Sequence, residues 1–64
     1  MNGIIKQLHP EKGFGFIKGD DNQEYFFHRS GLKNCKFEEL DKGQNVTFEE
    51  SDGPKGLRAE DIYV

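Results

Sequence analysis

Two short segments of the chain concentrate the side chains that could bind a ligand. Residues 12–17 are Lys-Gly-Phe-Gly-Phe-Ile, and residues 25–30 are Tyr-Phe-Phe-His-Arg-Ser. Flat aromatic rings can stack on the faces of unpaired nucleobases, and lysine or arginine side chains beside them can pair with phosphates. The combination indicates recognition of a nucleic acid strand by stacking and charge.

Chemistry that makes or breaks covalent bonds has little support in the sequence. His28 and Ser30 could form a base and a nucleophile, but they are two residues apart and no orienting acid is evident. Cys35, His9 and His28 are too sparse a set for a structural zinc site. The segment of residues 12–16 lacks the glycine spacing and the Gly-Lys-Ser/Thr ending of a phosphate-binding loop. We therefore expect no enzymatic activity, no metal, no cofactor and no small-molecule substrate.

The alternation of side chains along residues 12–19 separates two different faces. Burial of Phe14 and Phe16 is one interpretation, because an aromatic pair on a strand is more often buried than functional. However, Lys12 and Lys18 share their face, and burying those charges would be costly. Ile17, with glycines on the same face, fits the interior of a tightly curved barrel. We predict that Lys12, Phe14 and Phe16 point outward and that Phe26 and His28 join them from the next strand.

Turn residues divide the chain into short segments of β-prone sequence, and no helical periodicity extends over a useful length. Strands are expected near residues 2–8, 13–18, 24–28, 45–50 and 57–63. The connection of residues 29–43 is expected to hold one helical turn. Closure hides the edges of such a small sheet, so the pattern predicts an all-β fold, a small five-stranded antiparallel barrel. With 64 residues, the chain is expected to form a single domain over residues 1–64.

Charge and apolar content limit the cellular setting and the partner. The sequence has no secretory signal and no apolar segment near the length of about 20 residues that spans a membrane. With a single cysteine, these features predict a cytoplasmic monomer that does not associate with membranes. The net charge is −3, but residues 1–18 carry three lysines and one acid, whereas residues 38–64 carry eight acids and three basic residues. A weakly basic face is therefore compatible with a nucleic acid partner.

The two segments, in this order and at this spacing, resemble the two ribonucleoprotein-type motifs of the cold-shock domain. That domain is the single-strand-binding barrel of bacterial cold-shock proteins and eukaryotic Y-box proteins. Residues 3–6 (GIIK), 37–50 (FEELDKGQNVTFEE) and 53–62 (GPKGLRAEDI) are also similar to the family, so the resemblance covers nearly the whole chain.

The resemblance implies an oligonucleotide/oligosaccharide-binding (OB) fold that binds single-stranded RNA or DNA with low sequence preference. It also implies a role as an RNA chaperone or a cold-shock-type regulator of transcription or translation. Phe37 is assigned to the binding surface by the resemblance alone, and a hydrophobic residue that anchors the loop is the alternative interpretation. The ligand-face positions implied by the family are Lys6, Lys12, Phe14, Phe16, Phe26, His28 and Phe37; Arg29 and Arg58 are added as cations for phosphates.

Three departures from the family pattern affect binding. Gln7 stands where the family has a stacking tryptophan, and Arg29 replaces an aromatic residue after the motif histidine. Glu24 is one methylene longer than the usual aspartate. The guanidinium of Arg29 can stack on a base and pair with a phosphate. We expect the balance of binding to shift from stacking toward charge.

A second interpretation is a small barrel that uses the same aromatic face to contact another protein. The effect of salt distinguishes the two functions. Binding through phosphates weakens as salt rises, whereas an aromatic protein contact should change little.

Overall fold

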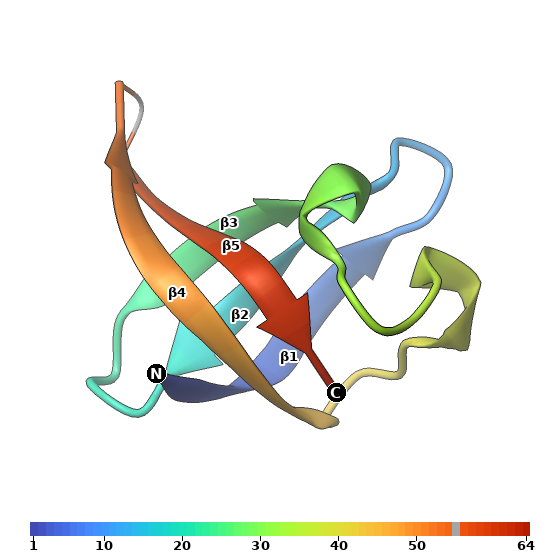
Figure 1. The fold of residues 1–64 in the computed structure, drawn as a ribbon, viewed down its shortest axis with the longest axis horizontal. Coiled ribbons are helices and arrows are strands. Elements are labelled where there is room, and N and C mark those ends of the chain that lie inside the picture. The colour runs from blue at the N-terminus through green and yellow to red at the C-terminus, as the bar shows by residue number, and fades with distance from the viewer. Residues whose placement is uncertain (55) are drawn as a thin grey trace.

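The computed structural model describes residues 1–54 and 56–64. Lys55, between the predicted strands of residues 45–50 and 57–63, lies outside the described residues. The described residues form five strands, all close to the predicted ranges (Figure 1): β1 (Asn2–His9), β2 (Phe14–Gly19), β3 (Glu24–His28), β4 (Asn45–Gly53) and β5 (Gly56–Tyr63). Among these residues, no helix is long and apolar enough to cross a membrane.

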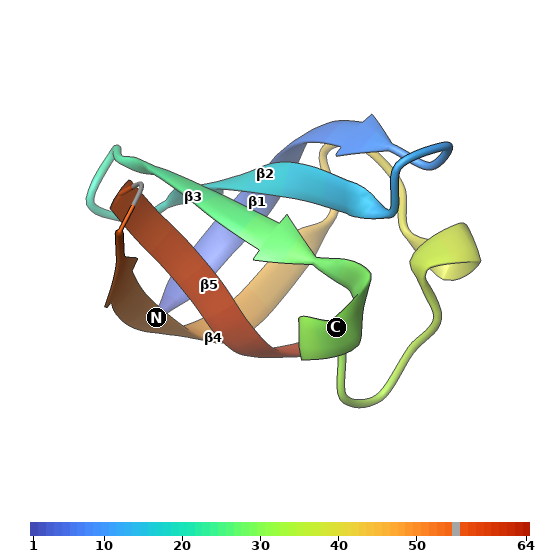
Figure 2. The ribbon, with the colours of Figure 1, turned by 90° about the horizontal axis from the view of Figure 1, so that it is seen from above.

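The strands close into a barrel in the order β1-β2-β3-β5-β4, so the predicted all-β, five-stranded barrel is confirmed. Figure 2 shows β1, β2 and β3 along one side of the barrel and β4 and β5 crossing the other. Among the described strands, β3 and β5 pair in parallel and the other neighbours are antiparallel. Four of the five described strand pairs are therefore antiparallel, as predicted, and one is parallel. A closed ring with an odd number of strands cannot alternate direction at every step, so one pair must be parallel.

The core confirms the predicted assignment of strand faces. Ile17 on β2 and Phe27 on β3 are 0% exposed, and Tyr25 is 1% exposed, whereas Phe14 and Phe16 lie only half-buried on the outer surface. Lys12 and Lys18 remain exposed, as their charges require. The buried hydrophobic cluster of the described residues consists of Ile5, Ile17, Tyr25, Phe27, Phe37, Leu40, Val46, Phe48, Ala59 and Ile62.

Gly15 explains why glycine alternates with phenylalanine on β2. Its Cα faces the inside of the barrel opposite Phe27, with which it is in register. A Cβ there would lie 2.5 Å from the carbonyl oxygen of Gln7 and 2.8 Å from the Phe27 ring. The inner face of β2 therefore has no room for a side chain here, and the large rings of β2 lie on the outer face.

A β-bulge at Lys6 changes which side chains of β1 face outward. The register with β2 runs from Ile5 opposite Ile17 to Gln7 opposite Phe16, so Lys6 is the extra residue. Before the bulge Ile5 points into the core, and after it both Gln7 and His9 lie opposite outward-facing phenylalanines. The bulge therefore turns the end of β1 toward the outer surface of β2.

The connection between β3 and β4 contains two short 3-10 helices among its described residues, η1 (Arg29–Gly31) and η2 (Phe37–Glu39), where one helical turn was expected. Phe37 begins η2 and is only 7% exposed, with its ring centroid 6.0 Å from that of Phe27. The prediction that Phe37 lies on the ligand surface is therefore wrong for this structure. The ring covers the open end of the barrel and anchors the connection, because the core beneath it would otherwise be exposed to water.

A hydrogen-bond network closes the opposite end of the core. The hydroxyl of Tyr25 lies 2.6 Å from Asp21 Oδ2 and 2.9 Å from Glu50 Oε2, so it donates to either carboxylate. This hydrogen bond lowers the pKa of Asp21, and the same carboxylates raise the pKa of Tyr25 because they favour its protonated form. The loop before β3 is therefore tied to β4 through one buried ring.

Tyr25→Phe is expected to lower the melting temperature at pH 7 and to weaken the acid sensitivity of the fold. Asp21 has a folded pKa below its unfolded value, so its contribution is full above about pH 4 and is lost as pH falls through the folded pKa. The difference in melting temperature between parent and variant should shrink as pH falls from about 4 to 2. Tyr63→Phe, which removes the hydroxyl of an exposed ring, is the control. A constant difference between pH 7 and pH 2 would contradict the role of Asp21.

Candidate nucleic-acid interface

Rings from three adjacent strands meet on the outer surface of the barrel. His9 ends β1 opposite Phe14, Phe14 lies opposite His28, and Phe16 lies opposite Phe26. Each is half-buried, so one part of the ring packs on neighbours and the rest faces solvent. These five residues, His9, Phe14, Phe16, Phe26 and His28, are called the aromatic face below.

The rings of the aromatic face have two orientations. His9 and Phe14 have centroids 4.9 Å apart and planes inclined by 37°, and Phe14 and Phe26 have centroids 5.4 Å apart and planes inclined by 36°. Phe16 stands nearly perpendicular to Phe14, at 89°, and to His9, at 87°. Such tilted and edge-to-face contacts hold aromatic rings in place. His9, Phe14 and Phe26 therefore form a fixed row that crosses from β1 to β3.

Arg58 extends the row onto β5. Its guanidinium carbon lies 5.5 Å from the centroid of Phe26, within the range of a cation–π contact. A hollow of about 490 Å³ begins here, lined by Phe16, Phe26, Pro54, Gly56, Leu57 and Arg58. The rings of Phe16 and Phe26, with the guanidinium of Arg58, suit a planar, weakly polar group such as a nucleobase.

Cations border the aromatic face but differ in their availability. Lys6 pairs with Glu24, which also lies opposite Lys18 in the β2–β3 register. Lys12 is exposed in the turn before β2. Arg29 follows His28, and its side chain runs beside Gly13, where a Cβ would lie 3.2 Å from Arg29 Cδ. The positive charge is thus strongest around the β1–β2 turn, whereas Glu24 reduces it at the other end.

His28 is held by the backbone that follows it. Its Nδ1 accepts a hydrogen bond from the backbone N–H of Ser30 at 3.2 Å and lies 3.0 Å from the Ser30 hydroxyl. Because Nδ1 is an acceptor, the neutral ring carries its proton on Nε2. His28 therefore offers one N–H donor, and its contact with Ser30 caps η1.

Sequence comparisons agree with this geometry. A family model described as the 'Cold-shock' DNA-binding domain matches residues 1–64. The chain belongs to the cold-shock domain family. Cold shock protein 2 of Lactiplantibacillus plantarum is 41% identical over 61 residues, which cover 95% of this chain and 92% of that protein. The major cold shock protein of Micrococcus luteus is 43% identical over 61 residues, covering 94% and 91%. Cold shock-like protein CspE of Bacillus anthracis is 39% identical over 62 residues, covering 97% and 92%.

The structure of this cold-shock domain brings most of the predicted site residues together. Phe14, Phe16, Phe26 and His28 lie on the aromatic face, Arg58 lies over one of its rings, and the other predicted cations border it. Phe37 is the exception, because it belongs to the core. The surface positions of these residues are therefore as predicted, whereas their contacts with nucleic acid stay a prediction.

His9 is the member of the aromatic face that the sequence did not suggest. Strict alternation from Ile5 would turn His9 inward, and only the bulge at Lys6 brings it outward. Its proximity to Phe14 would follow from the sequence only if the bulge were known beforehand. The lysine and glutamine at positions 6 and 7, two polar residues in succession on a strand, are the one available signal.

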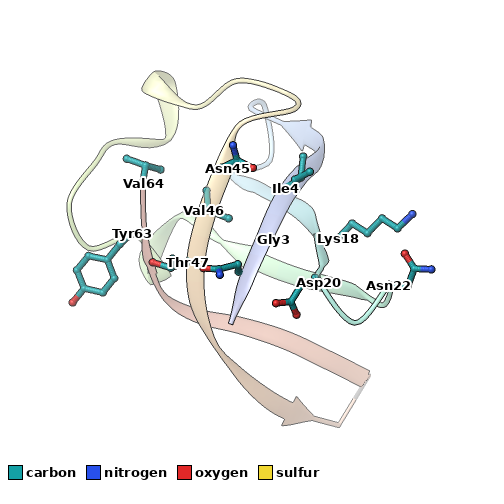
Figure 3. A pocket seen from close by; sticks show the side chains of 12 residues that line it. Gly3, Ile4, Lys18, Asp20, Asn22, Asn45, Val46, Thr47, Tyr63 and Val64 are labelled. Atoms are coloured by element: carbon teal, nitrogen blue, oxygen red, sulfur yellow. The ribbon is translucent and has the colours of Figure 1, made fainter.

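A larger hollow lies elsewhere (Figure 3). It has a volume of about 720 Å³ and lies at the start of β1 and the end of β2, whereas the aromatic face occupies the other ends of both strands. Exposed apolar side chains, Ile4, Tyr63 and Val64, lie beside polar ones there. Among the described residues that line it, Tyr63 is the one aromatic ring, so this hollow offers no row of rings like that of the aromatic face.

Cys35 has the surroundings of an unreactive thiol. It packs half-buried against the core cluster in the β3–β4 connection. Burial, with a smaller effect of Glu39, raises the pKa of the thiol and so disfavours the reactive thiolate.

Proposed function

We propose that this cold-shock domain binds single-stranded RNA or DNA with low sequence specificity through the aromatic face and its bordering cations. The observation that carries the proposal is the row of half-buried rings that crosses three strands. Rings that remain partly exposed on so small a protein leave apolar surface in water, which soluble monomers seldom do without a binding role. The proposed contact residues are Lys6, Lys12, Phe14, Phe16, Phe26, His28, Arg29 and Arg58.

The proposed mechanism needs no chemical fuel. A base that has opened transiently stacks on a ring of the aromatic face, and its phosphate meets a cation at the border. Bound strands cannot pair, so the equilibrium shifts from duplex toward single strand by mass action. Every base offers a π-face, so the binding tolerates many sequences. This is the behaviour of an RNA chaperone or a cold-shock-type regulator.

The remaining parts of the proposal concern how the domain works in the cell. Residues 1–64 act as one domain, as a monomer, in the cytoplasm, and without enzymatic activity or a small-molecule substrate. The weak positive charge at the border, on a chain of net charge −3, supports a small number of phosphate contacts beside the stacked bases.

Binding of a heptanucleotide of thymidine is expected to weaken only modestly as salt rises. Lys6 is paired with Glu24, and Arg58 lies over the Phe26 ring. We therefore expect about two to four cations to contact phosphates, so the slope of log K against log salt should lie near −1.4 to −2.8. Fluorescence anisotropy from low to high salt measures it. Arg29→Phe, which keeps a flat group but removes a charge, should flatten the slope by about 0.7.

Duplex DNA of the same length provides the control for stacking. It should compete far less well, because its bases are already stacked on each other. Equal competition by duplex, or a slope steeper than about −5, would show that binding is electrostatic and lies away from the aromatic face. Loss of all salt dependence would instead favour the protein-contact function.

A further inference from the structure

His9 occupies the β1 end of the ring row, but it is not among the contact residues proposed above. Its ring lies 4.9 Å from Phe14 and 6.4 Å from Phe16, centroid to centroid. Its side chain keeps 37% of its surface exposed, so part of the imidazole is open to a ligand. The row of planar groups on the outer surface thus runs through His9, Phe14 and Phe26 to Arg58.

The backbone holds His9 firmly in this place. Its carbonyl oxygen accepts hydrogen bonds from the N–H groups of Lys12, at 3.0 Å, and Gly13, at 2.9 Å. Gly13 has a φ of 72°, which the turn requires and which glycine adopts without strain. The β1–β2 turn therefore holds the backbone of His9 in place, and the ring packs beside Phe14.

We propose that His9 is a nucleic-acid contact that stacks on a base at the β1 end of the aromatic face and takes up a proton when the strand binds. This inference rests on the proposed function, because it extends the same surface by one ring. The ligand class is a single-stranded polynucleotide, which supplies both a base for stacking and phosphates that attract an imidazolium.

The charges around His9 permit the proton. Glu11 of the turn has Oε1 3.9 Å from His9 Nδ1, so a carboxylate lies at ion-pair distance from a protonated ring. Lys12 belongs to the same turn, and the side chain of Arg29 runs beside Gly13, so two cations also border this end of the aromatic face. Strand β2 presents only Phe14 and Phe16, which carry no charge.

Bound phosphates change this balance. They engage the neighbouring cations and add negative charge near the ring, both of which favour the charged imidazole. A histidine ordinarily changes its charge between pH 5 and 8. The complex therefore binds more protons than the free components in that range, so affinity must rise as pH falls.

The other histidine of the chain does not share this property. His28 Nδ1 already accepts from the backbone N–H of Ser30, and protonation of that nitrogen would break the cap of η1. The two histidines therefore form a matched pair on one surface, of which His9 alone can gain a proton without losing a hydrogen bond.

The test measures binding of a thymidine heptanucleotide at pH 6 and pH 8 by fluorescence anisotropy at fixed salt. The parent should bind several-fold more tightly at pH 6 than at pH 8, because the complex takes up a proton over this range. His9→Ala should weaken binding about five-fold or more at pH 8 and remove most of the pH dependence. His9→Phe should retain the affinity at pH 8 but lose the pH dependence, which separates stacking from charge. His28→Gln should weaken binding yet keep the pH dependence.

The outcomes distinguish failure of this inference from failure of the proposed function on which it rests. If the parent does not bind the strand, or if Phe14→Ala binds as well as the parent, the proposed function fails. If the parent binds and Phe14→Ala is weakened, but His9→Ala matches the parent at both pH values, only the role of His9 is wrong. If the pH dependence disappears in His28→Gln and persists in His9→Phe, the proton is taken up at His28 and the inference is overturned. Circular dichroism of each variant confirms that it is folded.

Discussion

Phe14→Ala is expected to weaken binding of a single strand about five- to 150-fold while the barrel remains folded. The ring lies at the centre of the row, in contact with His9 and Phe26, so its removal takes away a stacking surface and separates its neighbours. Loss of a stacking aromatic costs about 1–3 kcal/mol per base. Because the ring is only half-buried, the melting temperature should fall slightly. Anisotropy titration and a thermal melt measure the two effects.

Two matched variants make this result decisive. Phe27→Ala removes a ring that is 0% exposed and should cost about 3–5 kcal/mol, enough to unfold a domain of this size. Tyr63→Ala removes an exposed ring beside the other hollow and should leave binding unchanged. If Phe14→Ala unfolds while Phe27→Ala does not, the strand faces are assigned in reverse.

Gln7→Trp is expected to tighten binding by about 1–3 kcal/mol, close to the contribution of one stacked base. Gln7 lies opposite Phe16 in the β1–β2 register and is exposed, so an indole there would extend the aromatic face beside Phe16. No charge changes, so the salt slope should stay the same. The chain has no tryptophan, so the fluorescence of the new residue reports directly on its surroundings. A base that stacks on the indole should quench it.

Tyr63→Trp supplies the matched control, because it places an equally exposed indole away from the aromatic face. Its fluorescence should not respond to the strand. Unchanged affinity in Gln7→Trp, with fluorescence that does not respond to the strand, would mean that the aromatic face does not carry nucleic acid. In that case the contact with another protein would become the leading function.

The sequence was sufficient to predict which side chains of β2 and β3 point outward, because the alternation of side chains and the positions of the charged residues agree there. Lys12 and Lys18 could not be buried with Phe14 and Phe16, and this decided the two faces before the structure was known. On β3 the same period placed Tyr25 and Phe27 in the core, and both are nearly fully buried. A strict period of two is reliable only where the register is regular.

The sequence was not sufficient where the register shifts or where the chain leaves the sheet. The bulge at Lys6 reverses the faces of β1, and no simple rule locates a bulge from residue types. Phe37 lies in a connection without regular alternation, so its direction depended on what the open end of the barrel had to cover. The parallel pair of β3 and β5 depends on the closure of the whole ring.

The parallel pair of β3 and β5 also indicates where the barrel opens locally most easily. Strands β3 and β5 share the register pair of Phe26 with Arg58, and the bridge of Leu32 with Ile62 continues the contact beyond β3. The antiparallel strand pairs described here have more residues in register than β3 and β5 have. The contact between β3 and β5, called the seam below, is therefore where local opening is expected. The seam lies directly beneath the contact of Arg58 with Phe26, at one end of the aromatic face. A nucleic acid strand that contacts both Phe26 and Arg58 would join β3 to β5. Its binding would therefore also stabilise the barrel against local opening between these two strands.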